Sequence, residues 1–289
     1  MAEKSDTQDC LTRGLFSAAS SRVSMVQLDR TWRAVLERHH YPPAIESILG
    51  ELMAAAALLA STIKNDGQLK LEIRGQGPLT LVAIECAADG NMRGLARWSE
   101  PFAASGDLQA LTGGGLLVMT TESAKGKRYQ GIVSLEGDKV ATVLERYFRD
   151  SEQLPTRLWL TTSDQRASGF LLQQLPGERE PDSWERLQYL SETVTDEELL
   201  TLPAEQLFYR LYHQETLQLL PTQGFRFHCG CSRQRVADML VSLGRQEIEE
   251  TLAQEGEVAV DCEFCNQVYR FDQQAAIALF GPPNQSVLH

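Results

Sequence analysis

The sequence has a deficit of positive charge. Its 289 residues include 27 Lys and Arg against 39 Asp and Glu, which gives a net charge of −12 and a pI near 5.0. A nucleic-acid-binding protein needs basic surface to neutralise phosphates, so we expect no nucleic acid partner. Anionic membrane surfaces would repel the same negative charge.

Long hydrophobic runs are also missing. The longest apolar run, residues 52–60, is far too short to cross a bilayer, so we expect no membrane partner. Residues 1–9 contain no apolar segment of the kind found in signal peptides. We therefore expect a cytoplasmic location, where thiols stay reduced. The glycines at 113–115 lack the Lys and Ser/Thr of a phosphate-binding loop.

Cysteine is scarce, and four of the six cysteines lie near the C-terminus in two close pairs. Cys229 and Cys231 form a C-x-C pair, and Cys262 and Cys265 form a C-x-x-C pair. Thiolates are soft ligands, and four of them can close a tetrahedral shell around Zn²⁺. We interpret these four residues as the ligands of one zinc ion. Permanent disulfides are a further possibility, but nothing in the sequence indicates secretion.

The C-x-C spacing holds two thiolates close enough to oxidise to a disulfide. A site built from such ligands could be emptied by oxidation. A purely structural zinc site, on an adaptor or a nucleic-acid binder, is one alternative. A zinc hydrolase or a thiol–disulfide oxidoreductase is another, although four thiolates leave no open coordination position for catalysis. We interpret His228, beside the first pair, as a packed or surface strand residue rather than a ligand or base.

The two remaining cysteines lie far from these pairs. We expect Cys10 on a mobile end of the chain and Cys86 at the end of a strand, and we assign neither a role.

Residues 1–177 combine strand-like and helical patterns. Helices are expected at 30–39, 43–64 and 139–150, and strands at 23–28, 69–74, 79–84, 92–98, 115–121, 129–135, 157–162 and 169–175. Helices interspersed with short strands are typical of an α+β domain with a largely antiparallel sheet and packed helices. The second helix has apolar residues at helical spacing and is apolar all round over residues 54–60, so it should be buried against the sheet.

Residues 178–224 carry ten acidic and three basic side chains. Apolar residues at helical spacing predict amphipathic helices, with Trp184, Phe208, Tyr209 and Tyr212 as aromatic docking contacts. Short isolated helices are only marginally stable. We therefore expect a helical linker that folds only while it is docked.

Residues 225–289 form the expected C-terminal zinc-binding domain. Alternating residues on both sides of Cys262 and Cys265 predict a hairpin, with the second cysteine pair in its turn. A domain of this size usually needs an additional stabilising element, such as a disulfide or a structural metal ion. Structural zinc supplies about 10–16 kcal/mol of apparent binding free energy in small domains, so loss of the metal should unfold this one.

The chain resembles the redox-regulated bacterial holdase family HslO (heat-shock protein thirty-three) over essentially its whole length. The motifs that carry the resemblance are His228-Cys229-Gly230-Cys231, Cys262-Glu263-Phe264-Cys265, the turn Gly75-Gln76-Gly77-Pro78-Leu79 and Tyr41-Pro42-Pro43 before an Ala/Leu-rich helix. The resemblance implies an α+β core, a helical linker and a zinc domain. It also implies an ATP-independent chaperone that is not an enzyme.

The resemblance further implies how activity is switched. The reduced, zinc-bound monomer would be inactive, and peroxide or hypochlorous acid together with unfolding stress would form the disulfides Cys229–Cys231 and Cys262–Cys265. Zinc would leave, the zinc domain and linker would unfold, and a homodimer would bind unfolding client proteins. Thiol-reducing systems would reverse the change, and ATP-dependent chaperones would receive the clients. Because the C-x-C disulfide closes a tighter, more strained ring, we expect Cys262–Cys265 to form first.

Overall fold

The computed structural model describes residues 9–60, 67–102, 106–123 and 125–280 of the chain. The chain divides into two compact units, Met1–His228 and Cys229–His289.

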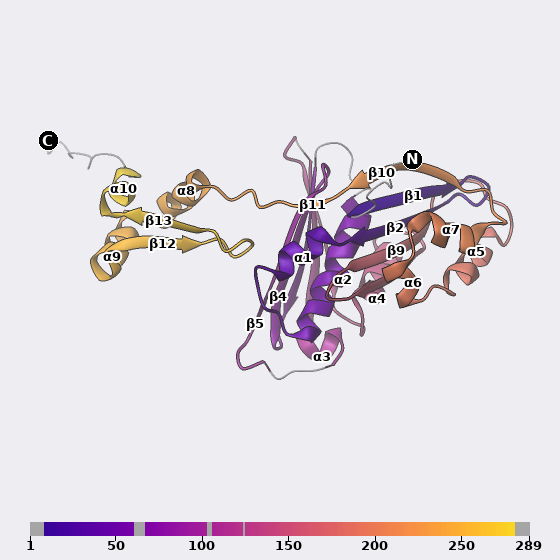
Figure 1. Cartoon of the computed structure of the whole chain (residues 1–289), viewed down its shortest axis with the longest axis horizontal. Helices are drawn as coiled ribbons and strands as arrows, with labels where there is room; N and C mark the ends of the chain where they lie inside the picture. Colours follow the sequence, from indigo (N-terminus) through magenta and orange to yellow (C-terminus); the bar gives the residue numbers. More distant parts are fainter. Residues whose placement is uncertain (1–8, 61–66, 103–105, 124, 281–289) are drawn as a thin grey trace, which may run out of the picture. The chain divides into compact units, whose positions relative to one another are not determined.

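Two sheets form the framework of the first unit among its described residues (Figure 1). One sheet has the strand order β10-β1-β2-β9-β8, formed by Gln218–Gly224, Cys10–Phe16, Ser21–Leu28, Ala167–Gln174 and Thr156–Thr162. The other has the order β11-β5-β4-β3-β6-β7, formed by Arg226–Phe227, Asn91–Trp98, Leu79–Ala87, Gln68–Gly75, Gly115–Glu122 and Arg128–Ser134. Neighbouring strands are antiparallel, except that β11 runs parallel to β5.

A buried helix, α2 (Pro43–Ala60), packs against strands of both sheets (Figure 1). Small residues allow the close approach: a Cβ on Gly50 would come within 2.2 Å of Thr162 Cγ2. The length and hydrophobicity of α2 would suit a membrane span, but most of its residues are buried in the protein. The other helices of this part are α1 (Arg30–Leu36), α3 (Leu108–Thr112) and α4 (Val140–Asp150).

Glu51 on α2 gives the first unit a testable pH dependence. Burial raises the pKa of its carboxyl to about 7, against the weaker opposing effects of a hydrogen bond from Ser47 and the charge of Lys139. The folded pKa lies above the ordinary value of 4.5, so the folded state binds the proton more tightly. The stability from this group is therefore fully present below about pH 4.5 and lost as pH rises through about 7.

We expect Glu51→Gln, which cannot ionise, to be more stable than the wild type by about 2 kcal/mol at pH 8 and to match it near pH 5. Urea unfolding followed by tryptophan fluorescence at both pH values measures this. If the difference in unfolding free energy between Glu51→Gln and the wild type is the same at pH 5 and pH 8, Glu51 ionises normally in the folded protein.

Three helices from the expected linker cover one face of the five-stranded sheet. They are α5 (Ser183–Ser191), α6 (Asp196–Thr201) and α7 (Ala204–Tyr212). Phe208 of α7 stacks edge-on against Phe170 of β9, with ring centroids 6.1 Å apart, and Tyr212 packs against Phe16 of β1 at 4.9 Å. The apolar stripe of the linker therefore forms a core with the sheet.

Hydrogen bonds also fix α6 to the sheet at the helix C-terminus. Gln27 Nε2 and Ser168 Oγ both donate to the carbonyl of Leu199, at 2.9 and 2.7 Å. The guanidinium of Arg166 donates to the carbonyl of Leu200. These carbonyls lie at the end of the helix and have no partner within it. The side chains of the sheet therefore supply hydrogen bonds that the carbonyls would exchange for water if α6 undocked.

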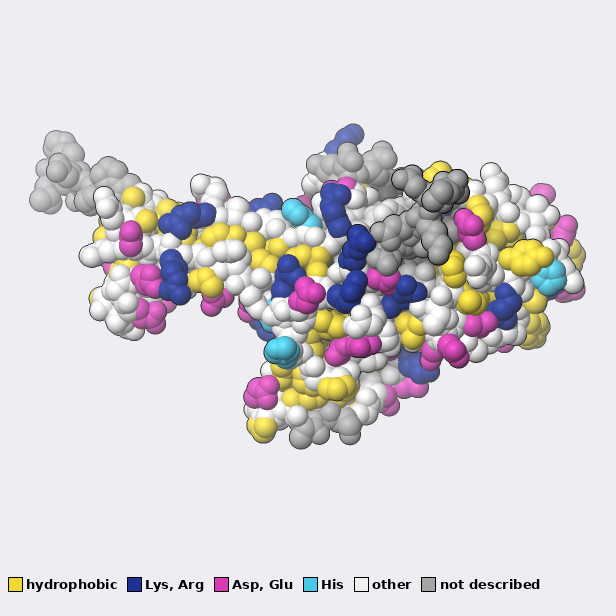
Figure 2. All heavy atoms as spheres, viewed as in Figure 1, with side chains coloured by type: hydrophobic (Ala, Val, Ile, Leu, Met, Phe, Trp, Pro, Cys, Tyr) yellow, Lys and Arg dark blue, Asp and Glu magenta, His cyan; other side chains and the backbone are white. Residues whose placement is uncertain are grey.

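The structure corrects part of the linker prediction. Residues 218–224 form β10, which pairs with β1, rather than a helix. Their side chains are mostly exposed and lack clear alternation, so the pairing depends on the neighbouring strand and not on a local pattern. Tyr209 is 75% exposed and is not a docking contact, whereas Trp184 packs partly buried against the same core as Phe208. Figure 2 shows hydrophobic side chains reaching the surface in several places among charged ones.

Other expectations also change. Cys10 begins β1, between β2 and β10, and is not on a mobile end. There are two sheets in the described part of the first unit rather than one. Helix α1 ends at Leu36, short of residue 39, and residues 61–64 of the expected second helix lie outside the described residues. The division into core, linker and zinc-binding domain remains a prediction, with residues 178–224 packed here within the first unit.

The second unit is a small helix-and-hairpin structure. Its elements are α8 (Arg233–Leu243), α9 (Arg245–Glu255), β12 (Glu257–Asp261), β13 (Val268–Asp272) and α10 (Gln273–Ala278). Strands β12 and β13 pair antiparallel, as the alternation predicts. The buried cluster contains Val236, Ala237, Leu240, Ile248, Leu252, Val258, Phe271 and Ala276. Such a core, with one buried aromatic side chain among the described residues, gives the unit little stability of its own.

Candidate metal centre

The second cysteine pair lies in the turn between β12 and β13, which we call the second knuckle (residues 262–265). The Cys262 N–H donates to the carbonyl of Gln267 at 3.0 Å and closes the turn. Its own carbonyl accepts from Asn266 N–H at 2.7 Å. Asn266 has φ +58°, a left-handed conformation that Asn tolerates better than most residues. The turn therefore holds both sulfurs on the same side.

The first pair, which we call the first knuckle (residues 229–231), leads directly into α8. Ser232 is the N-cap of this helix, and its side chain accepts from the Arg235 N–H at 3.3 Å. The Arg235 guanidinium donates to the carbonyl of Gly230 at 2.7 Å. These two bonds position the knuckle at the start of the helix.

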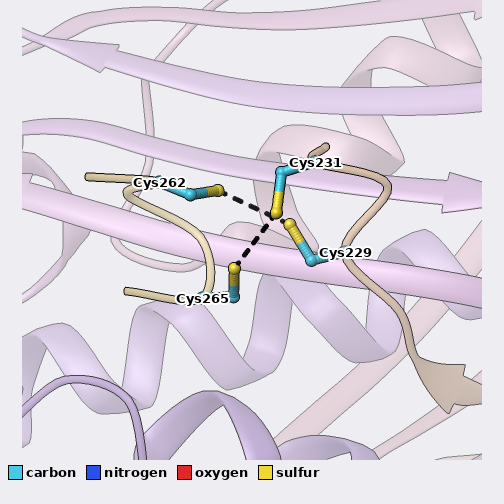
Figure 3. Close-up of side chains that lie close together, drawn as sticks. All are labelled: Cys229, Cys231, Cys262 and Cys265. Atoms are coloured by element: carbon cyan, nitrogen blue, oxygen red, sulfur yellow. Dashed lines mark hydrogen bonds between the residues drawn. The ribbon is translucent and has the colours of Figure 1, made fainter. Parts of the chain in front are cut away.

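The four sulfurs converge on one point (Figure 3). All lie within 4.8 Å of one another, and the two short separations cross between the knuckles: 3.6 Å for Cys229–Cys262 and 3.4 Å for Cys231–Cys265. A tetrahedral site with Zn–S bonds of about 2.3 Å has edges of about 3.8 Å. The donor type, number and spacing therefore fit a zinc ion. The structure brings together all four cysteines that the sequence predicts as ligands.

The protonation of the Cys262 and Cys265 thiols depends on a cation. Without one, burial raises the pKa of Cys265 to about 12 and also raises that of Cys262. A bound divalent cation reverses this effect because coordination favours the thiolate. Cys262 and Cys265 are therefore suited to ligate a cation.

Two further residues near the cysteine pairs in the sequence or in the fold are His228 and Tyr269. His228 is exposed and lies just after β11, outside the group of four, and its N–H donates to the carbonyl of Met92. Tyr269, which the sequence did not single out, donates its hydroxyl to Cys231 Sγ at 3.1 Å. Strand alternation places it on the same face as Phe271, but only the fold shows that its hydroxyl reaches the other knuckle.

The two other cysteines are poor redox candidates. Cys86 is fully buried in β4, and burial raises the pKa of its thiol to about 12. Burial and the nearby carboxylates of Asp9 and Asp29 raise the pKa of Cys10 as well. Because the thiolate is the reactive form, both residues are held in the less reactive state.

Comparisons with known proteins agree with this architecture. A family model described as Hsp33 protein matches residues 9–272. The chain is 47% identical over 276 residues to the 33 kDa chaperonin of Pseudomonas aeruginosa (strain LESB58), with 93% of each chain covered. It is 44% identical over 286 residues to the 33 kDa chaperonin of Vibrio cholerae serotype O1, covering 96% of this chain and 98% of the relative.

A solved structure shares the fold. The crystal structure of the 33 kDa chaperonin (heat shock protein 33 homolog) from Thermotoga maritima matches with a TM-score of 0.83 and 21% identity, covering 94% of this chain and 97% of that one. The family match over nearly the whole chain and the identity to these relatives lead to one conclusion. The chain belongs to the Hsp33 family, whose members are chaperones and not enzymes.

Proposed function

We propose that this protein is a redox-regulated, ATP-independent holdase. In the reduced monomer, Cys229, Cys231, Cys262 and Cys265 hold one Zn²⁺ and the chaperone is inactive. Peroxide or hypochlorous acid, acting with unfolding stress, converts the cysteines to the disulfides Cys229–Cys231 and Cys262–Cys265. The observation that carries the proposal is the convergence of four oxidisable sulfurs, at tetrahedral spacing, in a small separate unit.

The proposed disulfides would remove the link between the knuckles. A tetrahedral site joins residues 229–231 to residues 262–265, and the shortest sulfur separations cross from one knuckle to the other. Each proposed disulfide lies within a single knuckle, so oxidation would remove the link that the metal makes between the two knuckles. With its small apolar cluster, the second unit is then expected to unfold.

The linker provides the proposed route to client binding. The sequence enters the second unit through β11, and residues 183–212 contribute a large share of the core beside the five-stranded sheet. If unfolding spreads into this segment, it uncovers Phe208, Tyr212 and the apolar sheet face that they contact. Disordered segments can wrap varied partners, and ten acidic side chains keep the exposed chain soluble. The activated protein dimerises in the cytoplasm and holds unfolding clients.

A paired measurement tests the switch on the reduced full-length protein loaded with zinc. Peroxide is added at raised temperature, zinc release is followed with a chromogenic chelator, and suppression of aggregation of a thermally unfolding client is assayed on the same samples. We expect about one zinc per chain to be released, holdase activity to rise in parallel, and dithiothreitol with zinc to reverse both.

The main alternative within the family is a purely structural zinc site. It predicts that mild peroxide leaves the metal bound, because such a site resists oxidation. Zinc retention, or zinc loss without a gain in holdase activity, would refute the proposed switch and place the client-binding activity in the first unit alone.

A further inference from the structure

The hydroxyl of Tyr269 contacts the metal centre from outside the group of cysteines. It donates a hydrogen bond to Cys231 Sγ across 3.1 Å. Tyr269 belongs to β13, which returns from the second knuckle, whereas Cys231 belongs to the first. The contact therefore joins β13 to the first knuckle.

The Tyr269 ring is held in place by the fold of the second unit. The residue pairs with Val260 across the hairpin, and both pack half-buried against the apolar cluster. Phe271, two residues further on the same face, is fully buried in that cluster. An aromatic ring fixed in this way has few rotamers, so its hydroxyl is directed at one sulfur.

We propose that Tyr269 is a positioning residue that slows the oxidation of Cys231. This inference rests on the proposed redox function. A hydrogen bond to a thiolate stabilises the sulfur lone pair, and the thiolate then reacts more slowly with an oxidant. Tyr269 thereby slows formation of the Cys229–Cys231 disulfide.

The bond acts on a defined chemical step. The Cys231 thiolate attacks one oxygen of a hydroperoxide, so an S–O bond forms, the O–O bond breaks and hydroxide leaves. The Cys229 thiolate then attacks the resulting sulfenic acid; an S–S bond forms and a second hydroxide leaves. Two electrons pass from the sulfurs to the peroxide. The hydrogen bond stabilises the starting thiolate and is lost as its charge disappears, which raises the barrier of the first step.

The proposal also agrees with the expected order of disulfide formation. Ring strain already favours Cys262–Cys265 as the first disulfide. A hydrogen bond on Cys231 adds a second, independent reason, because it protects a sulfur of the other pair.

Tyr269→Phe tests this role by removing a single oxygen atom. The variant and the wild type are compared as full-length, reduced, zinc-loaded proteins. We expect the peroxide-driven formation of the Cys229–Cys231 disulfide to be about fivefold faster in the variant. Mass spectrometry after partial oxidation and alkylation should show a larger modified fraction of Cys231. Transfer of zinc to a chelator without oxidant should change by less than about twofold, since all four ligands remain.

Tyr189→Phe is the matched control, because it removes a hydroxyl from a tyrosine that is 69% exposed on α5. It should behave as the wild type. If Tyr269→Phe accelerates zinc transfer equally with and without peroxide, the residue only stabilises the fold and the proposal is wrong. Unchanged oxidation kinetics would also overturn it. Retention of zinc by the wild type under peroxide would instead refute the proposed redox function, and this result is distinguishable from the two outcomes that concern Tyr269.

Discussion

Replacing Cys262 with serine (Cys262→Ser) is expected to abolish zinc binding and unfold residues 229–280 in the reduced protein. A serine hydroxyl does not ionise near neutral pH and is a poor zinc ligand, so the remaining three thiolates cannot close the tetrahedral shell. The unit would lose most of the roughly 10–16 kcal/mol that structural zinc supplies in small domains. Zinc content by atomic absorption and the amide spectrum of residues 229–280 measure the two effects.

Cys10→Ser is the control for this change. Cys10 lies in β1 of the first unit, far along the chain from the four clustered cysteines, so its replacement should leave zinc content unchanged. A Cys262→Ser protein that keeps a full equivalent of zinc and an ordered second unit would show that the four sulfurs are not one site. An ordered second unit without zinc would show instead that the apolar cluster is sufficient for folding.

Truncating Phe208 to alanine is expected to release the linker without oxidation. The ring is 2% exposed and contacts Phe170 of β9. Loss of a buried phenylalanine costs about 3–5 kcal/mol, which is large compared with the stability of three short docked helices. We therefore expect Phe208→Ala to suppress client aggregation in the reduced, zinc-loaded state. Hydrogen exchange over residues 183–212 measures undocking in the same sample.

Tyr209→Ala offers a matched comparison within the same helix. Tyr209 is 75% exposed, so Tyr209→Ala removes an aromatic ring from the same helix without removing a buried contact. It should leave the reduced protein inactive. If Phe208→Ala undocks the linker and the protein still needs oxidation to hold clients, release of the linker is not the step that activates it.

The cysteine cluster could be predicted from the sequence because its chemistry depends on residue type and short spacing. Cys229 with Cys231, and Cys262 with Cys265, are each confined to one turn, and the alternating strands around the second pair predict the hairpin that presents it. Four soft donors have few partners other than zinc or each other. The structure places the four sulfurs within 4.8 Å of one another, in agreement with the predicted single site.

The amphipathic stripe of the linker could also be predicted from the sequence, but the sheet face on which it packs could not. Helical spacing identified Phe208 and Tyr212 as docking residues, whereas only the fold shows that they pack on Phe170 and Phe16. Strand β10 was missed for a related reason: its side chains are mostly exposed, and its backbone is ordered by hydrogen bonds to β1, which is some two hundred residues away in the chain.

Local pattern thus determined the α+β class and the two cysteine pairs, since each depends on neighbours within a few residues. Tertiary structure decided that two sheets enclose α2, that side chains from β2 and β9 hold the end of α6, and that Tyr269 reaches Cys231. These contacts join segments far apart in sequence. Their geometry is set by how the whole chain packs, which no local periodicity encodes.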